Sequence, residues 1–426
     1  MEEKNSMEKF STLKLHQSIT KALQRMKFKT PTPIQSQTIP LALMGKDILG
    51  RAQTGTGKTI AFAIPLISHL IKNRKDSALI LTPTRELAAQ VLQSIRELLD
   101  TKNPITTALL IGGDSMSKQL HQLKRKARIV VGTPGRTKDH LQRKTLILAS
   151  TTFLVLDETD RMLDMGFSKD INNILSKIPK HQTLLFSATI PKNIMSLAEK
   201  FLFDPVKISI GGENKPIKNV KQETLKVNQG GKYDQLVLQL DKRKGSIIIF
   251  VKTKRGAEKL AKKLRSENYS ADAIHGDLRQ SRRDRVILNY RRLKFRILVA
   301  TDVAARGLDI PHIEHVINYD ITQSPEDYVH RIGRTARAGA KGSAITFLTT
   351  VDKAKWEAIQ KLINPNFKSP TITTNLSRFK NSKNKYKKSK RNVKKFRSSK
   401  SSSGKENKQF TFKSKKKKYS KKKKHL

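Results

Sequence analysis

The chain contains no cysteine among its 426 residues. Without thiols it can form neither a disulfide nor a thiolate metal site, which excludes disulfide-built secreted scaffolds and cysteine zinc sites. It also has no apolar run close to the roughly 20 residues that a membrane-spanning helix needs. The chain starts with Glu2 and Glu3 in place of an apolar signal region. We therefore expect a cytoplasmic protein that is not secreted and has no membrane partner.

Acidic residues are scarce relative to basic ones. There are 35 Asp and Glu against 87 Lys and Arg, and the formal net charge is +52. Residues 371–426 hold 23 of the basic residues and a single acid, Glu406, so they supply +22 of this charge and residues 1–370 supply +30. A positive excess of this size in both parts predicts a polyanionic partner, most often a nucleic acid.

Apolar residues are also few in residues 371–426, which consist mainly of Lys, Ser and Asn. Such a segment cannot bury enough apolar surface to offset the entropy of ordering the chain, so we predict a disordered Lys-rich tail. Aromatic residues interleaved with lysines suit salt-sensitive RNA binding with base stacking. The alternatives are a solubilising tail or a localisation signal. The aromatic residues are Phe379, Tyr386, Phe396, Phe410, Phe412 and Tyr419.

Short apolar runs alternate with longer helical patterns through residues 1–365. This alternation is typical of a parallel sheet covered by helices on both faces. Two glycines and a proline interrupt it within 211–219, so we predict two α/β domains, at 1–210 and 220–370, joined by that linker. The predicted strands are Ala78–Leu81, Ala108–Ile111, Ile129–Val131, Phe153–Leu156, Thr183–Phe186, Ile247–Val251, Ala271–Ile274, Arg296–Ala300, His315–Asn318 and Ala344–Leu348, and Glu86–Leu99 is a predicted helix.

A loop of small residues, Ala52–Thr59, has the composition of a triphosphate cradle. Backbone N–H groups of a glycine loop and the N-terminus of the following helix bind phosphate oxygens. We expect Lys58 to reach the β- and γ-phosphates and the Thr59 hydroxyl to bind Mg²⁺. The strict pattern begins with Gly, where this chain has Ala52. The remaining residues assigned to the nucleotide are Gln53, Thr54, Gly55, Thr56 and Gly57.

Acidic residues directly follow the predicted strand Phe153–Leu156. In a phosphate-loop protein an acid at this place holds Mg²⁺, and a neighbouring acid can orient the attacking water. We therefore assign Asp157 to the metal and Glu158 to the base, although an ordinary acidic loop would also explain the segment alone. Ser187–Thr189 ends another strand, where hydroxyls could couple the nucleotide site to the second domain or could simply form a turn.

Three arginines recur at every third position within His330–Arg337. Arginine neutralises charge on a transferring phosphoryl group, and such a residue contributes about 10³–10⁵ in rate. A solvated basic face or an RNA phosphate contact is the alternative. The segment Ala300–Asp309 lies at another strand end and could touch ribose, phosphate or the first domain.

Taken in order, these motifs resemble those of the DEAD-box RNA helicases, and the resemblance covers about residues 10–350. It implies two tandem RecA-like domains that use ATP and Mg²⁺. Phe28 and Pro31–Gln35 look like the family's adenine-reading motif, so Gln35 would hydrogen-bond adenine and Phe28 would pack on the ring. Ala52 is then the usual first residue of the family's phosphate loop.

The resemblance implies further roles, residue by residue. Arg334 and Arg337 would bind the γ-phosphate, and Gly307 and Asp309 would lie on the ribose side of the nucleotide. The segment Asp160–Phe167 is similar to the corresponding segment in the bacterial housekeeping branch of this family. Coupling would involve Asp160, Ser187, Thr189 and His330, and RNA contacts would involve Pro83, Thr84, Arg85, Gly113, Thr133, Pro134, Gly135 and Arg136 with Thr253, Thr301 and Asp302.

The chain departs from the family pattern at three places. Thr159 replaces the alanine of the naming tetrapeptide, and it could shift the attacking water or leave it unchanged. Lys27 stands where a glycine usually precedes the aromatic residue, and Ala336 replaces a common glycine of the arginine motif. None of the charged catalytic groups is lost, so we predict an active RNA-dependent ATPase.

The resulting hypothesis is an ATP-dependent RNA helicase with a monomeric core. It would contact RNA through phosphates and ribose without sequence preference, and would unwind short duplexes or remodel RNA–protein complexes. One alternative is an ATP-gated RNA clamp or annealing chaperone without productive unwinding. Another is a DNA translocase, against which the adenine-reading motif argues. Ribosome biogenesis or RNA decay is the expected setting, with ribosomal or degradation-complex proteins as partners.

Overall fold

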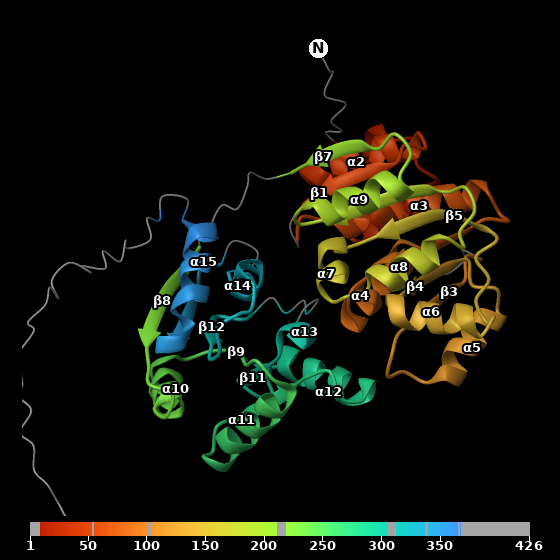
Figure 1. Cartoon of the computed structure of the whole chain (residues 1–426). Coiled ribbons are helices and arrows are strands. Elements are labelled where there is room, and N and C mark those ends of the chain that lie inside the picture. Colours follow the sequence, from red (N-terminus) through yellow and green to blue (C-terminus); the bar gives the residue numbers. More distant parts are fainter. Residues whose placement is uncertain are drawn as a thin grey trace, which may run out of the picture. The chain divides into compact units, whose positions relative to one another are not determined.

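The computed structural model of the chain contains two sheets, each flanked by helices (Figure 1). It describes residues 9–52, 55–99, 104–210, 219–305, 308, 310, 312–336, 340–364 and 367. The first domain runs from α1 (Gln17–Arg25) to β7 (Val206–Ser209), preceded by the short 3₁₀ turn η1 (Phe10–Thr12). The second domain runs from β8 (Val220–Lys226) to α15 (Lys353–Ile363).

Parallel strands make up the whole of the first sheet. They are β1 (Ile48–Arg51), β2 (Ser77–Leu81), β3 (Thr107–Leu110), β4 (Ile129–Gly132), β5 (Thr151–Leu156), β6 (Gln182–Ser187) and β7. Their order is β3-β4-β2-β5-β6-β1-β7. Strand β1 therefore lies between the last two strands of the domain, with Gly50 opposite Phe186 on one side and Ile208 on the other.

Helices cover both faces of the first sheet because its strands are apolar on both sides. In β5, Phe153 and Val155 pack into one buried cluster and Leu154 and Leu156 into another. The first cluster lies under α1, α2 (Pro33–Leu43), α3 (Lys58–Lys72) and α4 (Arg85–Leu98). The second lies under α7 (Thr159–Asp164), α8 (Ser168–Leu175) and α9 (Lys192–Phe201), with α5 (Met116–Lys124) and α6 (Pro134–Gln142) at its side.

The second sheet has the same parallel construction. Its strands are β8, β9 (Ile247–Phe250), β10 (Ala271–Ile274), β11 (Ile297–Ala300), β12 (His315–Asn318) and β13 (Gly342–Leu348), in the order β10-β11-β9-β12-β13-β8. Alternate residues again enter two clusters, Ile248 on one face and Ile247 and Ile249 on the other. The flanking helices are α10 (Lys232–Lys242), α11 (Lys254–Ser266), α12 (Gln280–Arg291), α13 (Asp302–Ala305), α14 (Pro325–Ile332) and α15, with the turn η3 (Thr350–Asp352) before α15.

Capping residues start a helix soon after each of two central strands. The Thr84 hydroxyl accepts from Leu87 N at the start of α4, and the Thr253 hydroxyl accepts from Gly256 N at the start of α11. A proline follows Thr133 at the start of α6, where a missing N–H costs nothing. Each tight strand-to-helix turn places polar residues at the carboxyl end of its sheet.

The predicted fold class is confirmed: two tandem parallel sheets carry helices on both faces. All ten predicted strands and the helix predicted at Glu86–Leu99 occur, with ends shifted by up to two residues. Strands β1, β7 and β8 were not predicted, because each carries few apolar residues. The tail at 371–426 and the linker up to residue 218 lie outside the described residues. No helix within the described part of the chain is long and apolar enough to cross a membrane.

Candidate functional site

The carboxyl ends of the first sheet's strands sort the predicted site residues into two groups. The strand order puts β5, β6 and β1 on one side, and these lead into Asp157, Ser187–Thr189 and the phosphate loop. On the other side, β2, β4 and β3 lead into Thr84, Thr133 and Gly113. Ligands of open parallel sheets bind at this edge. We name the first group the nucleotide-type half of the edge and the second group the RNA-type half, after the roles predicted from the sequence. The two halves meet where β5 pairs with β2.

The phosphate loop is shaped by a left-handed glycine. Gly57 has φ +95° and directly precedes Lys58, the first residue of α3. A Cβ at Gly57 would clash with the side chains of Gln35 and Thr32. Lys58 is buried and its Nζ donates to Ala52 O over 3.1 Å. The ammonium is thus folded over its own loop, at the N-terminus of a 15-residue helix, where anions bind.

The adenine-reading motif braces this loop from outside. Gln35 Nε2 donates to Gly57 O over 3.0 Å, and its Oε1 accepts from Thr32 N over 2.9 Å. The Thr32 hydroxyl donates to Thr56 O over 2.7 Å. Gln35 is therefore buried and holds the loop, while the ring of Phe28 is 37% exposed. The structure brings Gln35 to the phosphate loop, and an exposed ring face remains on Phe28.

Residues Asp157–Asp160 follow β5, and we call them the acidic turn. This turn faces Lys58. Asp157 Oδ1 lies 3.8 Å from Lys58 Nζ, and both side chains are buried. Burial raises the pKa of Asp157 to about 6, against the lowering effect of Lys58 and with a further raising effect of Glu158. Glu158 itself has left-handed backbone, φ +50° and ψ +50°. A bound cation would stabilise the Asp157 carboxylate that burial destabilises, so Asp157 with the half-buried Thr59 fits a Mg²⁺ site.

Asp160 is the centre of a network that joins the acidic turn to the end of β6. Its Oδ2 accepts from Ala188 N, Thr189 N and the Thr189 hydroxyl over 3.1–3.2 Å. Ser187 Oγ accepts from Asp160 N over 3.3 Å and donates to Thr189 O over 2.6 Å. The structure thus brings together three of the four residues predicted to couple the two domains.

Two arginines gather at the RNA-type half of the edge. Gly113 has φ +80°, and a Cβ there would clash with the Arg85 guanidinium, so Arg85 lies directly over the Gly112–Gly113 turn. Burial lowers the pKa of Arg85, and the positive charges of Arg283 and Arg136 lower it further. Arg136 Nη1 is buried and has no hydrogen-bond partner in the part of the chain that the structure describes. Clustered, under-satisfied guanidinium groups are suited to phosphate oxygens.

Two residues that the sequence analysis missed hold this half together. Gln119 is fully buried and donates to Ile111 O over 3.0 Å and Asp114 O over 3.3 Å. His140, in α6, contacts Gln119 Oε1 through Nε2 over 3.2 Å. Since that oxygen only accepts, His140 Nε2 is the donor. The pair fixes the loop that carries Gly113 to the helix that carries Arg136. A buried His at helical spacing from a motif was the signal available in the sequence.

The second sheet presents its arginines differently. Arg331 is buried and forms a two-pronged pair with Asp302, with Nε–Oδ1 at 2.5 Å and Nη2–Oδ2 at 2.8 Å. Its Nη1 also donates to Asp320 O over 2.5 Å. Arg334 donates to Leu308 O over 3.0 Å. The carboxylate of Asp302, predicted to contact RNA, is therefore occupied by Arg331.

The other residues that the sequence predicts to contact RNA also lie just after strands of the two sheets. Thr253 is exposed where β9 leads into α11, and Thr301 is buried where β11 leads into α13. Both follow the carboxyl ends of strands that pair with each other in parallel, so the structure places them at the same edge. Pro83 lies in the turn after β2, and Pro134 and Gly135 are the first two residues of α6, which follows β4. The residues that lie outside the described part of the chain are Gln53, Thr54, Gly307, Asp309 and Arg337.

Ionic contacts join residues of the first domain to residues of the second. Glu86 Oε1 and Arg283 Nε lie 2.6 Å apart, and both side chains are at most 5% exposed. Arg161 Nη1 lies 3.0 Å from Asp327 Oδ1, and Arg161 Nη2 donates to His330 Nε2 over 2.9 Å. His330, the fourth predicted coupling residue, therefore meets Arg161, which follows the acidic turn by one residue.

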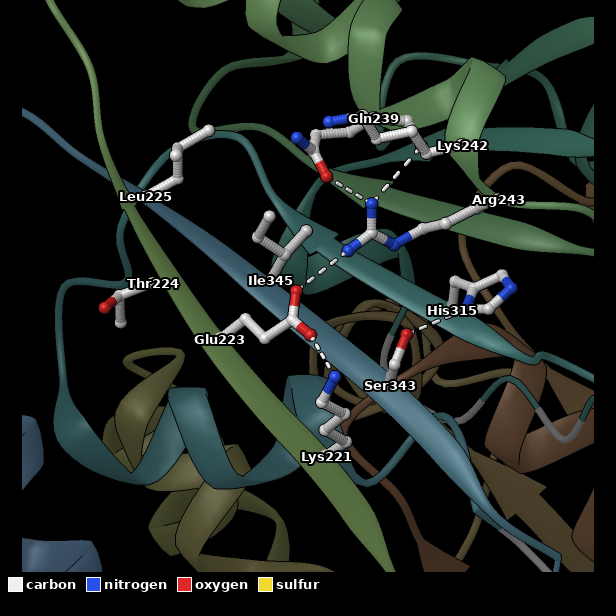
Figure 2. A pocket seen from close by; sticks show the side chains of 10 residues that line it. All are labelled: Lys221, Glu223, Thr224, Leu225, Gln239, Lys242, Arg243, His315, Ser343 and Ile345. Atoms are coloured by element: carbon white, nitrogen blue, oxygen red, sulfur yellow. Dashed lines mark hydrogen bonds and ion pairs between the residues drawn. The ribbon is translucent and has the colours of Figure 1, made fainter.

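A separate hollow in the second domain lies beside β8, β12 and β13 (Figure 2). Lys221, His315 and Ser343 stand at the amino ends of β8, β12 and β13. Its ionic groups satisfy one another, with Arg243 Nη2 3.1 Å and Lys221 Nζ 2.8 Å from the Glu223 carboxylate. None of the residues predicted to bind nucleotide or RNA lines this hollow, so it is not the candidate site.

Comparison with known proteins agrees with this geometry. Residues 32–197 match the DEAD/DEAH box helicase family and residues 231–339 match the helicase conserved C-terminal domain. The DEAD-box ATP-dependent RNA helicase CshA of Bacillus licheniformis is 43% identical over 85% of this chain and 76% of its own length. CshA of Geobacillus kaustophilus is 46% identical over 80% of this chain and 74% of its own.

Solved structures of similar proteins contain both kinds of ligand. Dbp5 of S. cerevisiae bound to RNA and ADP BeF3 is 33% identical, with a TM-score of 0.75 over 84% of this chain and 94% of that one. Mss116p bound to ssRNA and AMP-PNP is 30% identical, with a TM-score of 0.76 over 84% of this chain and 78% of that one. With its phosphate loop, acidic turn and paired parallel sheets, the chain belongs to the family of DEAD-box ATP-dependent RNA helicases.

Proposed function

We propose that this protein hydrolyses ATP to bind, bend and release RNA, and that it separates the strands of short duplexes locally. The observation that carries the proposal is the division of one sheet edge into a nucleotide-type half and an RNA-type half that share the β2–β5 boundary. A change in one half can reach the other across a single pair of neighbouring strands.

The nucleotide half is suited to a purine triphosphate. Lys58 and the N-terminus of α3 would neutralise the phosphates, Phe28 would pack on the base, and Gln35 would read the adenine edge while it holds the loop. Glu158 would accept a proton from the attacking water. Thr59 and Asp157 would hold Mg²⁺, which supplies charge neutralisation at the β- and γ-phosphates.

The RNA half is suited to a sugar–phosphate backbone. Arg85 and Arg136 offer guanidinium groups, and the glycine at 113 leaves room for the Arg85 guanidinium over the turn. We expect these groups to contact phosphate and 2′-OH, which are common to all RNA sequences, so sequence preference would be weak. In the second domain, Thr253 and Thr301 would extend the same backbone contact, and Arg334 would neutralise charge on the γ-phosphate.

The first experiment measures ATP turnover of the full chain with single-stranded RNA, single-stranded DNA or neither. We expect stimulation by RNA and little by DNA. Glu158→Gln, which keeps shape and removes the base, should bind ATP and RNA normally and lower kcat by at least about 100-fold. Glu199→Gln, at an exposed position of α9, is the matched control and should turn over ATP at the parental rate. Parental turnover by Glu158→Gln would contradict the assignment of the base.

The second experiment separates unwinding from clamping. A short RNA duplex with a labelled strand is incubated with protein and ATP, and the same strands are followed in an annealing assay. ATP-dependent displacement supports local unwinding. Stable ATP-dependent binding or annealing without displacement would instead support an RNA clamp or annealing chaperone.

A further inference from the structure

Thr159 stands inside the acidic turn, where the resemblance leads one to expect alanine. Its side chain is completely buried. The hydroxyl oxygen lies 3.1 Å from Phe186 O and 3.3 Å from Leu156 O. A threonine hydroxyl has one hydrogen to donate, and both partners are main-chain carbonyls. The hydroxyl is therefore directed into the protein, between β5 and β6, and it does not contact the water that Glu158 would activate.

The residue before Thr159 needs to be held. Glu158 has left-handed backbone, a conformation that costs an L-residue with a Cβ roughly 1–2 kcal/mol. Such strain persists where surrounding contacts fix it. On one side, Asp157 Oδ1 accepts from Glu158 N over 3.0 Å, and Asp157 N donates to Leu81 O over 3.0 Å. On the other side, the Thr159 hydroxyl reaches back to the strands. The two sets of bonds bracket Glu158.

The carbonyl that Thr159 contacts belongs to the residue just before Ser187. Asp160 already bonds the backbone of Ala188 and Thr189 at this place. Thr159 supplies a bond to the same strand end from a different side chain, one that neither alanine nor valine can make. We propose that Thr159 is a positioning residue. Its hydroxyl ties the turn that presents Glu158 to the end of β6, directly before the Ser187–Thr189 loop. This inference rests on the proposed ATP hydrolysis.

This tie has a consequence for turnover. A base that is mispositioned by a fraction of an ångström loses rate at the chemical step, while ligand binding is less affected. Loss of one buried hydrogen bond, with Phe186 O left to find another donor, is expected to lower kcat about tenfold. The affinity for ATP should change less than twofold, because Thr159 does not contact the phosphate loop in the described structure.

The experiment compares Thr159→Val, Thr159→Ser and Thr159→Ala in the full chain at saturating ATP and RNA. Valine keeps the shape and removes the hydroxyl, so kcat should fall about tenfold with KM for ATP nearly unchanged. Serine keeps the hydroxyl and should restore most of the rate. Alanine should resemble valine. Thr183→Val is the matched control for loss of a buried hydroxyl, because Thr183 is a fully buried threonine within β6. This variant should keep the parental kcat.

Two results would overturn the proposal. One is parental kcat in Thr159→Val, and the other is an equal loss in valine and serine variants, which would indicate packing alone. Hydrogen–deuterium exchange supplies a readout that does not require activity: peptides that contain residues 157–160 and 187–189 should exchange faster in Thr159→Val than in Thr159→Ser. If the parent hydrolyses no ATP, the proposed function fails, and the exchange data alone decide whether the hydroxyl holds the turn.

Discussion

The two sheets share one construction but treat their charged residues differently. At the first sheet's edge, Lys58 Nζ lies 3.8 Å from Asp157 Oδ1 and donates to Ala52 O, and Arg136 Nη1 has no partner in the described structure. At the second sheet's edge, Arg331 is saturated by its own domain through Asp302 and Asp320. The first domain is thus prepared for ligands, while this arginine of the second serves the fold.

The difference shows that an arginine-rich motif is not uniform. Three arginines at equal spacing in the sequence look equivalent, but helical geometry and burial separate their roles. Arg331 stacks over the Phe250 ring at 4.9 Å and stabilises the strand-end loops. Arg334 reaches the main chain at Leu308. Arginines of one basic motif can therefore hold different parts of their own domain.

The strongest test of the prepared first domain is Lys58→Ala. Removal of the buried ammonium should reduce kcat/KM for ATP by at least about 100-fold, because no other lysine lies in the described part of the phosphate loop. Lys118→Ala, at an exposed position of α5, is the matched control and should leave turnover unchanged. Nucleotide affinity is measured by calorimetry. Normal affinity and turnover in Lys58→Ala would show that the first domain is not the nucleotide site.

Arg331→Lys tests the structural role of the second domain's arginine. Lysine keeps the charge but cannot make the two-pronged pair with Asp302 or the bond to Asp320 O. We expect the free energy of unfolding of the second domain to fall by about 3 kcal/mol, measured by urea denaturation. Nucleotide binding by the first domain should be unchanged. Arg285→Lys, exposed on α12, should have no effect, and an unaltered unfolding transition in Arg331→Lys would refute the role.

Lowering the pH should reduce the free energy of unfolding of the first domain, because the unfolded chain binds a proton at His140 more readily than the folded domain does. Burial, with a contribution from the positive charge of Arg136, lowers the pKa of His140 below its usual value. The unfolded chain therefore takes up a proton near pH 6.5 that the folded domain resists. Stability from this group is complete above pH 6.5 and is lost as the pH falls, with a slope of at most about 1.4 kcal/mol per pH unit.

His140→Gln is the variant that tests this dependence. Glutamine does not titrate, so the stability of the variant should vary less than the parent's between pH 6.5 and 5. Thermal unfolding at several pH values provides the measurement. His121→Gln, at an exposed position of α5, serves as the control, and equal pH profiles for parent and His140→Gln would contradict the prediction.

The smallest expected effects concern Lys27 and Ala336, the two positions at which the family usually has glycine. Lys27 and Ala336 have φ of +58° and +55°, which explains why glycine is usual at both places in the family. Lys27 follows α1 as its left-handed cap, with Phe28 N donating to Leu23 O. Lys27→Gly and Ala336→Gly should each raise the free energy of unfolding by up to about 1 kcal/mol.

Together, Lys27→Gly and Ala336→Gly test whether the two domains differ in backbone strain or only in the side chains of their sites. Similar gains in both would mean that backbone strain is shared and that the contrast between the domains lies in their side chains. Chemical denaturation measures both variants beside Lys21→Gly, inside α1, which should lose about 1 kcal/mol. A loss of stability in Lys27→Gly would show that its left-handed backbone carries no strain.

The fold and much of the site follow from the sequence because they depend on local pattern. Buried strands are apolar on both faces, and motif residues follow them directly. What could not be predicted depends on tertiary packing. The hydrogen bond from His140 to Gln119 and the pairing of Arg331 with Asp302 join residues 21 and 29 positions apart. The left-handed backbone of Glu158 likewise has no signal in its residue type.

The order of strands in the sheets has a consequence for synthesis of the protein. Strand β1, which leads into the phosphate loop, pairs only with β6 and β7, the last strands of its sheet. A ribosome that adds about 5–20 residues per second would expose the loop on the order of ten seconds before these partners emerge. Strand β8 waits in the same way for β13. In each sheet the first strand pairs with the last one, so the strand that leads into the phosphate loop gains its neighbours only when the first domain has been made in full.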